Sequence, residues 1–146
     1  MKSKPLLILS GVFVTAVVIF IALRPALKRH IESVNCGNQM QALLFAAARM
    51  WPDDHDGHLP YDFLSMSNLL DTPEILVCPG DHLHQAAASW ATFTTNNSSY
   101  EIVAPGLLES DTNTIYMRCS IHGFVGYADD RLLDTSGRKI RPGHLW

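Results

Sequence analysis

The chain has 146 residues, enough for one domain, with 11 Lys and Arg against 14 Asp and Glu and a formal net charge of −3. All 14 acidic residues lie beyond residue 24, so residues 25–146 carry eight basic and fourteen acidic side chains, a net charge of −6. This acidity argues against nucleic-acid binding, because phosphates are bound by basic surfaces.

The first expected element is an apolar helix. Residues 1–4 form a short basic N-terminus, and the nineteen residues 5–23 that follow contain no charged side chain. A helix of nineteen residues rises roughly 29 Å, about the thickness of the hydrocarbon core of a bilayer. We therefore predict a transmembrane helix over residues 5–24. A cleaved signal peptide is the disfavoured alternative, because the apolar run is long and no A-x-A pattern follows it. Basic residues flank both ends, so charge alone does not orient the helix.

An amphipathic continuation of this helix is predicted over residues 25–51. Leu43, Leu44 and Ala47 recur at helical spacing with polar side chains between them. Pro52 ends the helix, since the residue before a proline is disfavoured in helical conformation. One apolar stripe cannot bury itself, so we expect a later part of the chain to cover it.

The remaining residues, 52–146, predict a small α+β domain. After a loop, Asp62 is expected to cap a short helix over residues 63–70, and residues 74–79 are expected to form a brief strand. Three β-like runs follow at 99–105, 114–119 and 123–128, which favours an antiparallel three-strand meander. The fold class predicted is α+β, with the long N-terminal helix packed on this small sheet.

Several short motifs occur in a fixed order along the chain. Residues 36–60, CGNQMQALLFAAARMWPDDHDGHLP, contain Cys-x-Asn-x-x-Gln, an Asp-rich turn and Leu-Pro, and the sequences ILVCPGD, SSY and Cys-x-x-His-Gly follow. Together with the basic start and the proline beyond the middle of the apolar helix, these motifs resemble the pseudopilins of bacterial type II secretion and type IV pilus systems. The resemblance extends over nearly the whole chain.

The resemblance implies a pilin-like fold and a structural or assembly subunit rather than an enzyme. It places the protein as a single-pass protein of the inner membrane, with its C-terminal domain on the extracytoplasmic, periplasmic side. Its partners would be the membrane and other pseudopilin-like subunits or secretion-system components. The chain departs from the family at the processing motif, where Gly11 in SGVFVTAVV is not followed by the usual Glu. We therefore expect a divergent member.

Three cysteines offer two kinds of site. In an extracytoplasmic domain a disulfide is available, and Cys78 with Cys119 is the favoured pair, because each lies at the edge of a strand-like run. Closing that loop of forty-two residues would contribute about 4 kcal/mol. Cys36 would then face either the helix seam or the lipid headgroups. The alternative is a membrane-tethered metal or thiol protein using Cys36, Cys78, Cys119 and His122. Zinc accepts these ligand types, but only Cys119 and His122 are close in sequence, so this interpretation is second.

No cofactor is expected, and calcium is the one ion that the resemblance suggests. By analogy with pseudopilins that bind calcium in a loop near the sheet, the ligands would be Asp111, Asn113, Asp129 and Asp130. The simpler interpretation is that these residues are turn formers. No nucleophile elbow, phosphate loop or H-E-x-x-H motif is present, so no catalytic residue is predicted.

Overall fold

The computed structural model describes residues 4–140, and the side chains from residue 17 onward. Helix α1 extends over Lys4–Phe45 and contains Pro25, and a π-helical turn, Ala46–Met50, continues it. A 3-10 turn, Pro52–Asp54, begins where the helix was expected to end. The prediction of a helix that ends at Pro52 is confirmed. The chain divides into two compact units, Met1–Ile31 and Glu32–Trp146.

In the first unit, every described side chain of α1 from residue 17 to 31 is exposed. Large apolar residues are among them, including Phe20 and Leu23, each 60% exposed. Within the part of the chain that the structure describes, no helix is long and apolar enough to cross a membrane. The greater part of the predicted span of residues 5–24, namely 5–16, lies outside the described side chains. The span stays a prediction.

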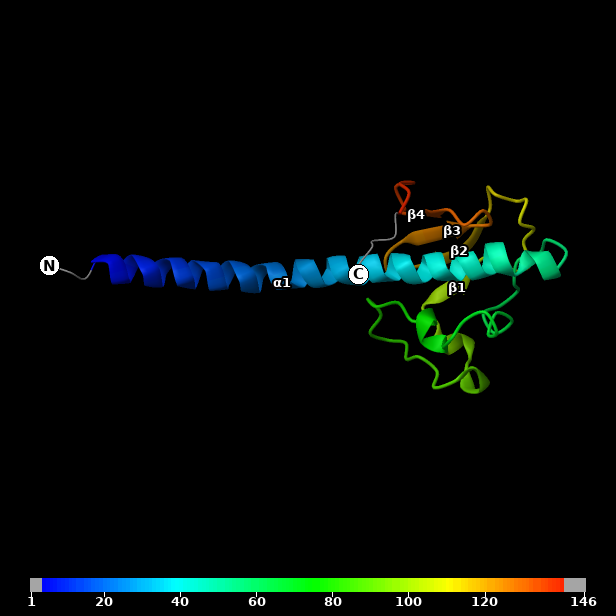
Figure 1. Cartoon of the computed structure of the whole chain (residues 1–146), viewed down its shortest axis with the longest axis horizontal. Coiled ribbons are helices and arrows are strands. Elements are labelled where there is room, and N and C mark those ends of the chain that lie inside the picture. The colour runs from blue at the N-terminus through cyan, green and yellow to red at the C-terminus, as the bar shows by residue number, and fades with distance from the viewer. Residues whose placement is uncertain (1–3, 141–146) are drawn as a thin grey trace. The chain divides into compact units, whose positions relative to one another are not determined.

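The second unit contains one antiparallel sheet. Its strands are β1 (Tyr100–Ile102), β2 (Ile115–Cys119), β3 (Phe124–Tyr127) and β4 (Leu132–Leu133), hydrogen-bonded in the order β1-β2-β3-β4 (Figure 1). The three predicted strands are confirmed as a meander, and β4 was not predicted. A register shift between Ile115 and Met117 puts an extra residue into β2. Because of this bulge, Tyr116 and Met117 are both fully buried although they are consecutive.

The C-terminal part of α1 packs against this sheet, as the α+β prediction requires. Its buried side chains Met40, Leu43 and Leu44 and the following Ala47 share one face of the helix and are 0% exposed. Leu44 lies directly over β3, since a Cβ atom added to Gly126 would be 2.6 Å from Leu44 Cδ1. Glycine at this position therefore lets the strand approach the helix closely.

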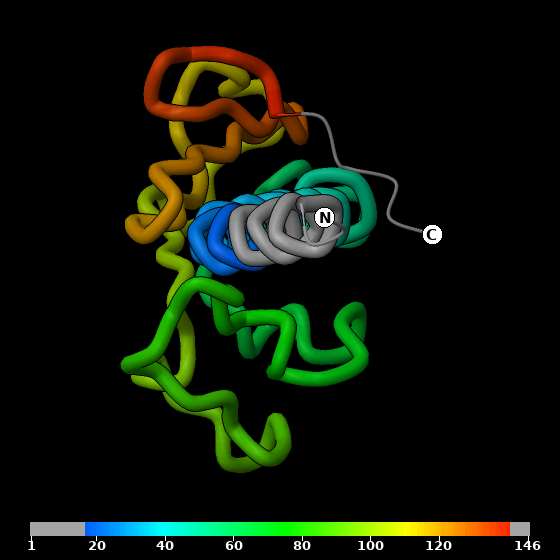
Figure 2. The backbone as a smooth tube through the Cα atoms, turned by 90° about the vertical axis from the view of Figure 1, so that its left-hand side faces the viewer, coloured from blue at the N-terminus to red at the C-terminus, as the bar shows by residue number. Residues whose placement is uncertain are grey.

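The long connection over residues 52–99 passes on the other side of the C-terminal part of α1 from strands β2–β4 (Figure 2). The strand predicted over residues 74–79 is wrong, because Pro73–Leu76 form a 3-10 turn with proline at its first position. The helix predicted over residues 63–70 is also wrong, since these residues form turns. Asp62 Oδ1 still accepts the Ser65 N–H at 2.8 Å, as a capping side chain does.

Candidate metal centre

Three cysteines and one histidine meet at a single point in the second unit. Cys36 comes from α1, Cys78 from the loop after the Pro73–Leu76 turn, Cys119 from the end of β2, and His122 from the turn between β2 and β3. The cysteines are 0%, 1% and 1% exposed. One ligand atom from each of the four lies within 4.8 Å of all the others. Among the described residues, this is the one group of His, Cys, Asp or Glu side chains gathered in this way.

Local backbone structure brings each ligand to this point. Cys36 precedes Met40 by four residues and Leu43 by seven, so it lies on the buried face of α1. Gly123, at φ +68°, ends the turn that carries His122. Gly80 leaves room for the imidazole, because a Cβ atom there would lie 2.9 Å from His122 Cε1. Gly80 therefore has a steric role in the site, and Gly123 supplies the left-handed backbone conformation that ends the turn.

The spacing of the ligand atoms matches a metal site better than a covalent bond. Cys36 Sγ and Cys119 Sγ are 3.5 Å apart, and Cys78 Sγ and His122 Nδ1 are 3.1 Å apart. Sulfur atoms bound to one tetrahedral zinc at about 2.3 Å lie about 3.8 Å from each other. A disulfide requires about 2.05 Å. All three cysteines are free thiols, and the predicted Cys78–Cys119 disulfide is not formed in the structure.

Comparison of the chain with protein-family models, curated proteins and solved structures finds no match. The pseudopilin resemblance therefore stays a prediction, and the chemistry of the site follows from its own geometry.

Hydrogen bonds shift the pKa values of the three cysteines in different directions. The thiols of Cys36 and Cys78 donate toward Cys119, and the backbone N–H groups of His122 and Ile121 do the same. Against the opposing effect of burial, these bonds hold the pKa of Cys119 well below its ordinary value. The same bonding raises the pKa of Cys36, and it raises the pKa of Cys78 to about 11. A metal ion that binds these sulfurs would displace thiol protons, because thiolate is the form of cysteine that binds metal.

Backbone N–H groups near two of the sulfurs favour the thiolate form. The Gly80 N–H, two residues after Cys78, acts to lower the pKa of Cys78, and the Ile121 N–H, two residues after Cys119, acts to lower the pKa of Cys119. Both loops thus direct amide dipoles at a sulfur, which stabilises thiolate in a buried setting.

The residues predicted to bind calcium lie elsewhere. Asp129 and Asp130 form ion pairs with Arg131 and Arg49, at 2.5 and 2.8 Å between side-chain nitrogen and oxygen. Asp111 and Asn113 are exposed in the loop before β2. The calcium site stays a prediction.

Spacing along the chain places the metal interpretation second, because it brings only Cys119 and His122 close together. The sequence does contain one signal that places Cys36 at the seam. Cys36 continues the heptad-like series of Met40, Leu43 and Ala47 along one face of the helix, and that face is buried. This buried position excludes the alternative in which Cys36 faces the lipid headgroups.

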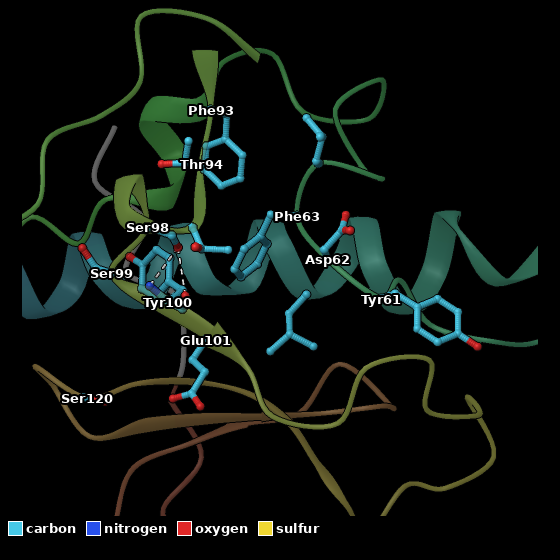
Figure 3. Close-up of a pocket in the computed structure, with 13 residues that line it drawn as sticks. Tyr61, Asp62, Phe63, Phe93, Thr94, Ser98, Ser99, Tyr100, Glu101 and Ser120 are labelled. Atoms are coloured by element: carbon cyan, nitrogen blue, oxygen red, sulfur yellow. Dashed lines mark hydrogen bonds between the residues drawn. The ribbon is translucent and has the colours of Figure 1, made fainter. Parts of the chain in front are cut away.

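A cavity of about 600 Å³ lies beside the site. Phe63 and Phe93 lie around it, and the segment Ser98–Tyr100 forms one wall (Figure 3). The same short segment thus faces the cavity and approaches two of the cysteine ligands.

Proposed function

We propose that this protein binds one zinc ion through Cys36, Cys78, Cys119 and His122, and that the ion has a structural role. The observation that carries the proposal is the convergence of four ligand atoms, from three separate parts of the chain, within 4.8 Å. Thiolate and imidazole are the ligands that zinc prefers, and a Cys₃His set is a common structural site.

The ligand count favours a structural ion over a catalytic one. A catalytic zinc keeps one coordination position open for water or substrate, whereas four protein ligands complete the tetrahedron. The burial of the three cysteines also limits access of a substrate. The site is therefore proposed to have no enzymatic activity.

The ion would add a link between elements that share one apolar core, in which Leu43, Leu76 and Phe124 are buried together. It links α1 to the loop after Leu76 and to the β2–β3 turn. Binding free energy at a site that is absent from the unfolded chain appears as folding free energy. Zinc would thus stabilise the packing of the long, irregular connection of residues 52–99 against the rest of the unit.

A second proposal concerns the N-terminal part of the chain. We propose a membrane-anchored, pseudopilin-like assembly subunit, with the second unit on the extracytoplasmic side. Its support is the packing of α1 on an antiparallel meander, the uncharged run of residues 5–23, and the exposed apolar side chains such as Phe20 and Leu23. The two proposals are compatible, because they assign roles to different segments.

The zinc proposal is tested on the full chain, purified in detergent with a reductant that does not bind metal. Zinc content is measured by elemental mass spectrometry, and free thiols are counted after unfolding with a chelator. We expect one zinc and three thiols per chain. His122→Ala should lose the zinc, and His55→Ala should keep it, since His55 is an exposed residue stacked on Trp51. Two oxidised cysteines with no metal would overturn the proposal in favour of the disulfide.

The anchor proposal is tested in membranes that contain the full chain. Alkaline extraction should leave the protein in the lipid fraction, and a photocrosslinker at position 20 should capture neighbouring subunits of a secretion or pilus assembly. Complete release by alkali rules out the anchor. Retention without any crosslinked subunit rules out the assembly role alone.

A further inference from the structure

Two consecutive residues, Ser99 just before β1 and Tyr100 at its first position, contact two different ligands of the proposed zinc site. Ser99 bonds the backbone of Cys78, and Tyr100 approaches the sulfur of Cys36. These ligands come from segments that are far apart along the chain. A short strand start therefore contacts both.

Ser99 is part of a directed chain of hydrogen bonds. The Cys78 N–H donates to Ser99 Oγ at 2.9 Å, and the Ser99 hydroxyl donates to Asp81 Oδ2 at 2.6 Å. The Asp81 side chain is only 3% exposed, and its other oxygen accepts the N–H groups of Leu83 and His84 at 2.7 and 3.1 Å. Asp81 N–H in turn bonds Cys78 C=O at 2.8 Å, which closes the loop. Asp81 Oδ2 also bonds His84 Nδ1 at 2.7 Å, so the carboxylate is held from several sides and the Cys78 backbone is tied to it directly and through Ser99.

Tyr100 provides the second contact. Its hydroxyl has two acceptors within reach, Gln39 Oε1 at 2.8 Å and Cys36 Sγ at 3.6 Å. Tyr100 is 4% exposed, and both acceptors lie on α1. The hydroxyl thus lies between the helix and the sheet at the position of the ligand that α1 supplies.

Ser98 fixes the conformation of this segment. Its hydroxyl accepts the Tyr100 N–H at 3.1 Å and donates to the Tyr100 C=O at 2.9 Å (Figure 3). The outward-facing backbone groups of Tyr100 are satisfied in this way, although β1 is an edge strand of the sheet. The segment is therefore held by its own bonds, independently of any metal.

We propose that Ser99, with Asp81 behind it, and Tyr100 are positioning residues that hold Cys78 and Cys36 at metal-binding distance. This inference rests on the proposed zinc site. Hydrogen bonds to the groups around a metal ligand fix its orientation, and their loss typically weakens metal affinity by about 10–100-fold. Neither residue is itself a zinc ligand.

The test measures zinc affinity of the full chain in detergent by competition with a chromophoric chelator. Ser99→Ala and Tyr100→Phe should each weaken zinc binding about tenfold. Ser99→Thr keeps the hydroxyl and should restore the affinity. Tyr116→Phe is the matched control, because Tyr116 is fully buried and its hydroxyl bonds Pro60 C=O at 2.9 Å, with no cysteine as partner. It should lower stability and leave zinc affinity unchanged.

The absorption spectrum of bound cobalt(II) is a measurement that a loss of stability alone would not change. Its visible absorption reports the donor strength of the bound thiolates, so Tyr100→Phe should shift the cobalt spectrum while Tyr116→Phe should not. Wild-type protein that binds no zinc overturns the proposed function and this inference with it. Wild-type protein that binds zinc, with affinity and cobalt spectrum unchanged in Ser99→Ala and Tyr100→Phe, overturns the inference alone. Tyr100→Phe retains the buried ring, so it decides the question if Ser99→Ala does not fold.

Discussion

Replacing Cys36 with alanine separates the two interpretations of the cysteines. In the disulfide interpretation Cys78 pairs with Cys119 and Cys36 has no partner, so the substitution removes only one buried sulfur. Removing a buried group of that size costs about 1 kcal/mol. In the zinc interpretation Cys36, 0% exposed on α1, is one of four ligands, and its removal abolishes most of the binding.

The expected magnitude follows from linkage between binding and folding. A ligand present at about 1,000 times its dissociation constant stabilises the folded state by about 4 kcal/mol. With zinc at that excess, Cys36→Ala should lower the free energy of unfolding by about 5 kcal/mol, the sum of the binding and burial contributions. With a strong chelator present, the difference between wild type and variant should fall to about 1 kcal/mol.

The assay is denaturant unfolding of the full chain in detergent, with a reductant throughout, once with zinc and once with chelator. The chelator arm serves as the control, because it compares the same two proteins without metal. An equal difference between wild type and Cys36→Ala in both arms would refute the reasoning, since the cost would then not depend on zinc.

Three further predictions concern the rest of the unit. Gly126→Ala should destabilise the protein by about 1–3 kcal/mol in denaturant unfolding, because the new Cβ would lie 2.6–3.0 Å from three Leu44 atoms, and adding Leu44→Ala should make the combined cost less than additive. Asp81→Asn should cost about 1.5–3 kcal/mol at neutral pH. Burial opposes ionisation of Asp81, but hydrogen bonds from Ser99, Leu83 and His84 outweigh it and hold the pKa below the ordinary 3.8. The stabilisation is thus present above that pH, and the difference between wild type and variant should shrink as pH falls below 3.8; a difference independent of pH would contradict this. Arg49→Ala should change the unfolding free energy by less than about 1 kcal/mol, since its ion pair with Asp130 is exposed, and a larger loss would show that the pair is coupled to the core.

The elements governed by local patterns were predictable. Helix periodicity and Pro52 located the end of the helical segment, and β-rich runs bounded by turn residues located β1, β2 and β3. The run Ile75–Val77 has the composition of a strand, but Pro73 favours the first turn of a helix, and this local preference determined the structure. Strand β4, with two residues, is too short to produce a periodic signal.

The candidate site was only partly predictable, for a physical reason. All four ligands could be named from their chemistry, yet which of them meet depends on long-range packing. Cys78 and Cys119 approach because the segment before β1 bonds the Cys78 loop and β1 pairs with β2, with Tyr100 opposite Cys119. Neither this hydrogen bond nor this strand pairing can be inferred from the spacing of the residues along the chain. The hydrogen bonds of Ser99 and Asp81 to the Cys78 backbone were not predicted, because serine and aspartate in loops are ordinary turn residues.

The place of Cys36 along α1 has a mechanical consequence. Counted from Ile31 toward the C-terminus, it is the first buried side chain of the helix, ahead of Met40, Leu43 and Leu44. With zinc bound, a pulling force on the N-terminal part of α1 would act on the bond between zinc and Cys36 before it acted on the buried apolar contacts. The helix would then detach when one metal–sulfur bond breaks, whereas an apolar interface without the ion would separate gradually.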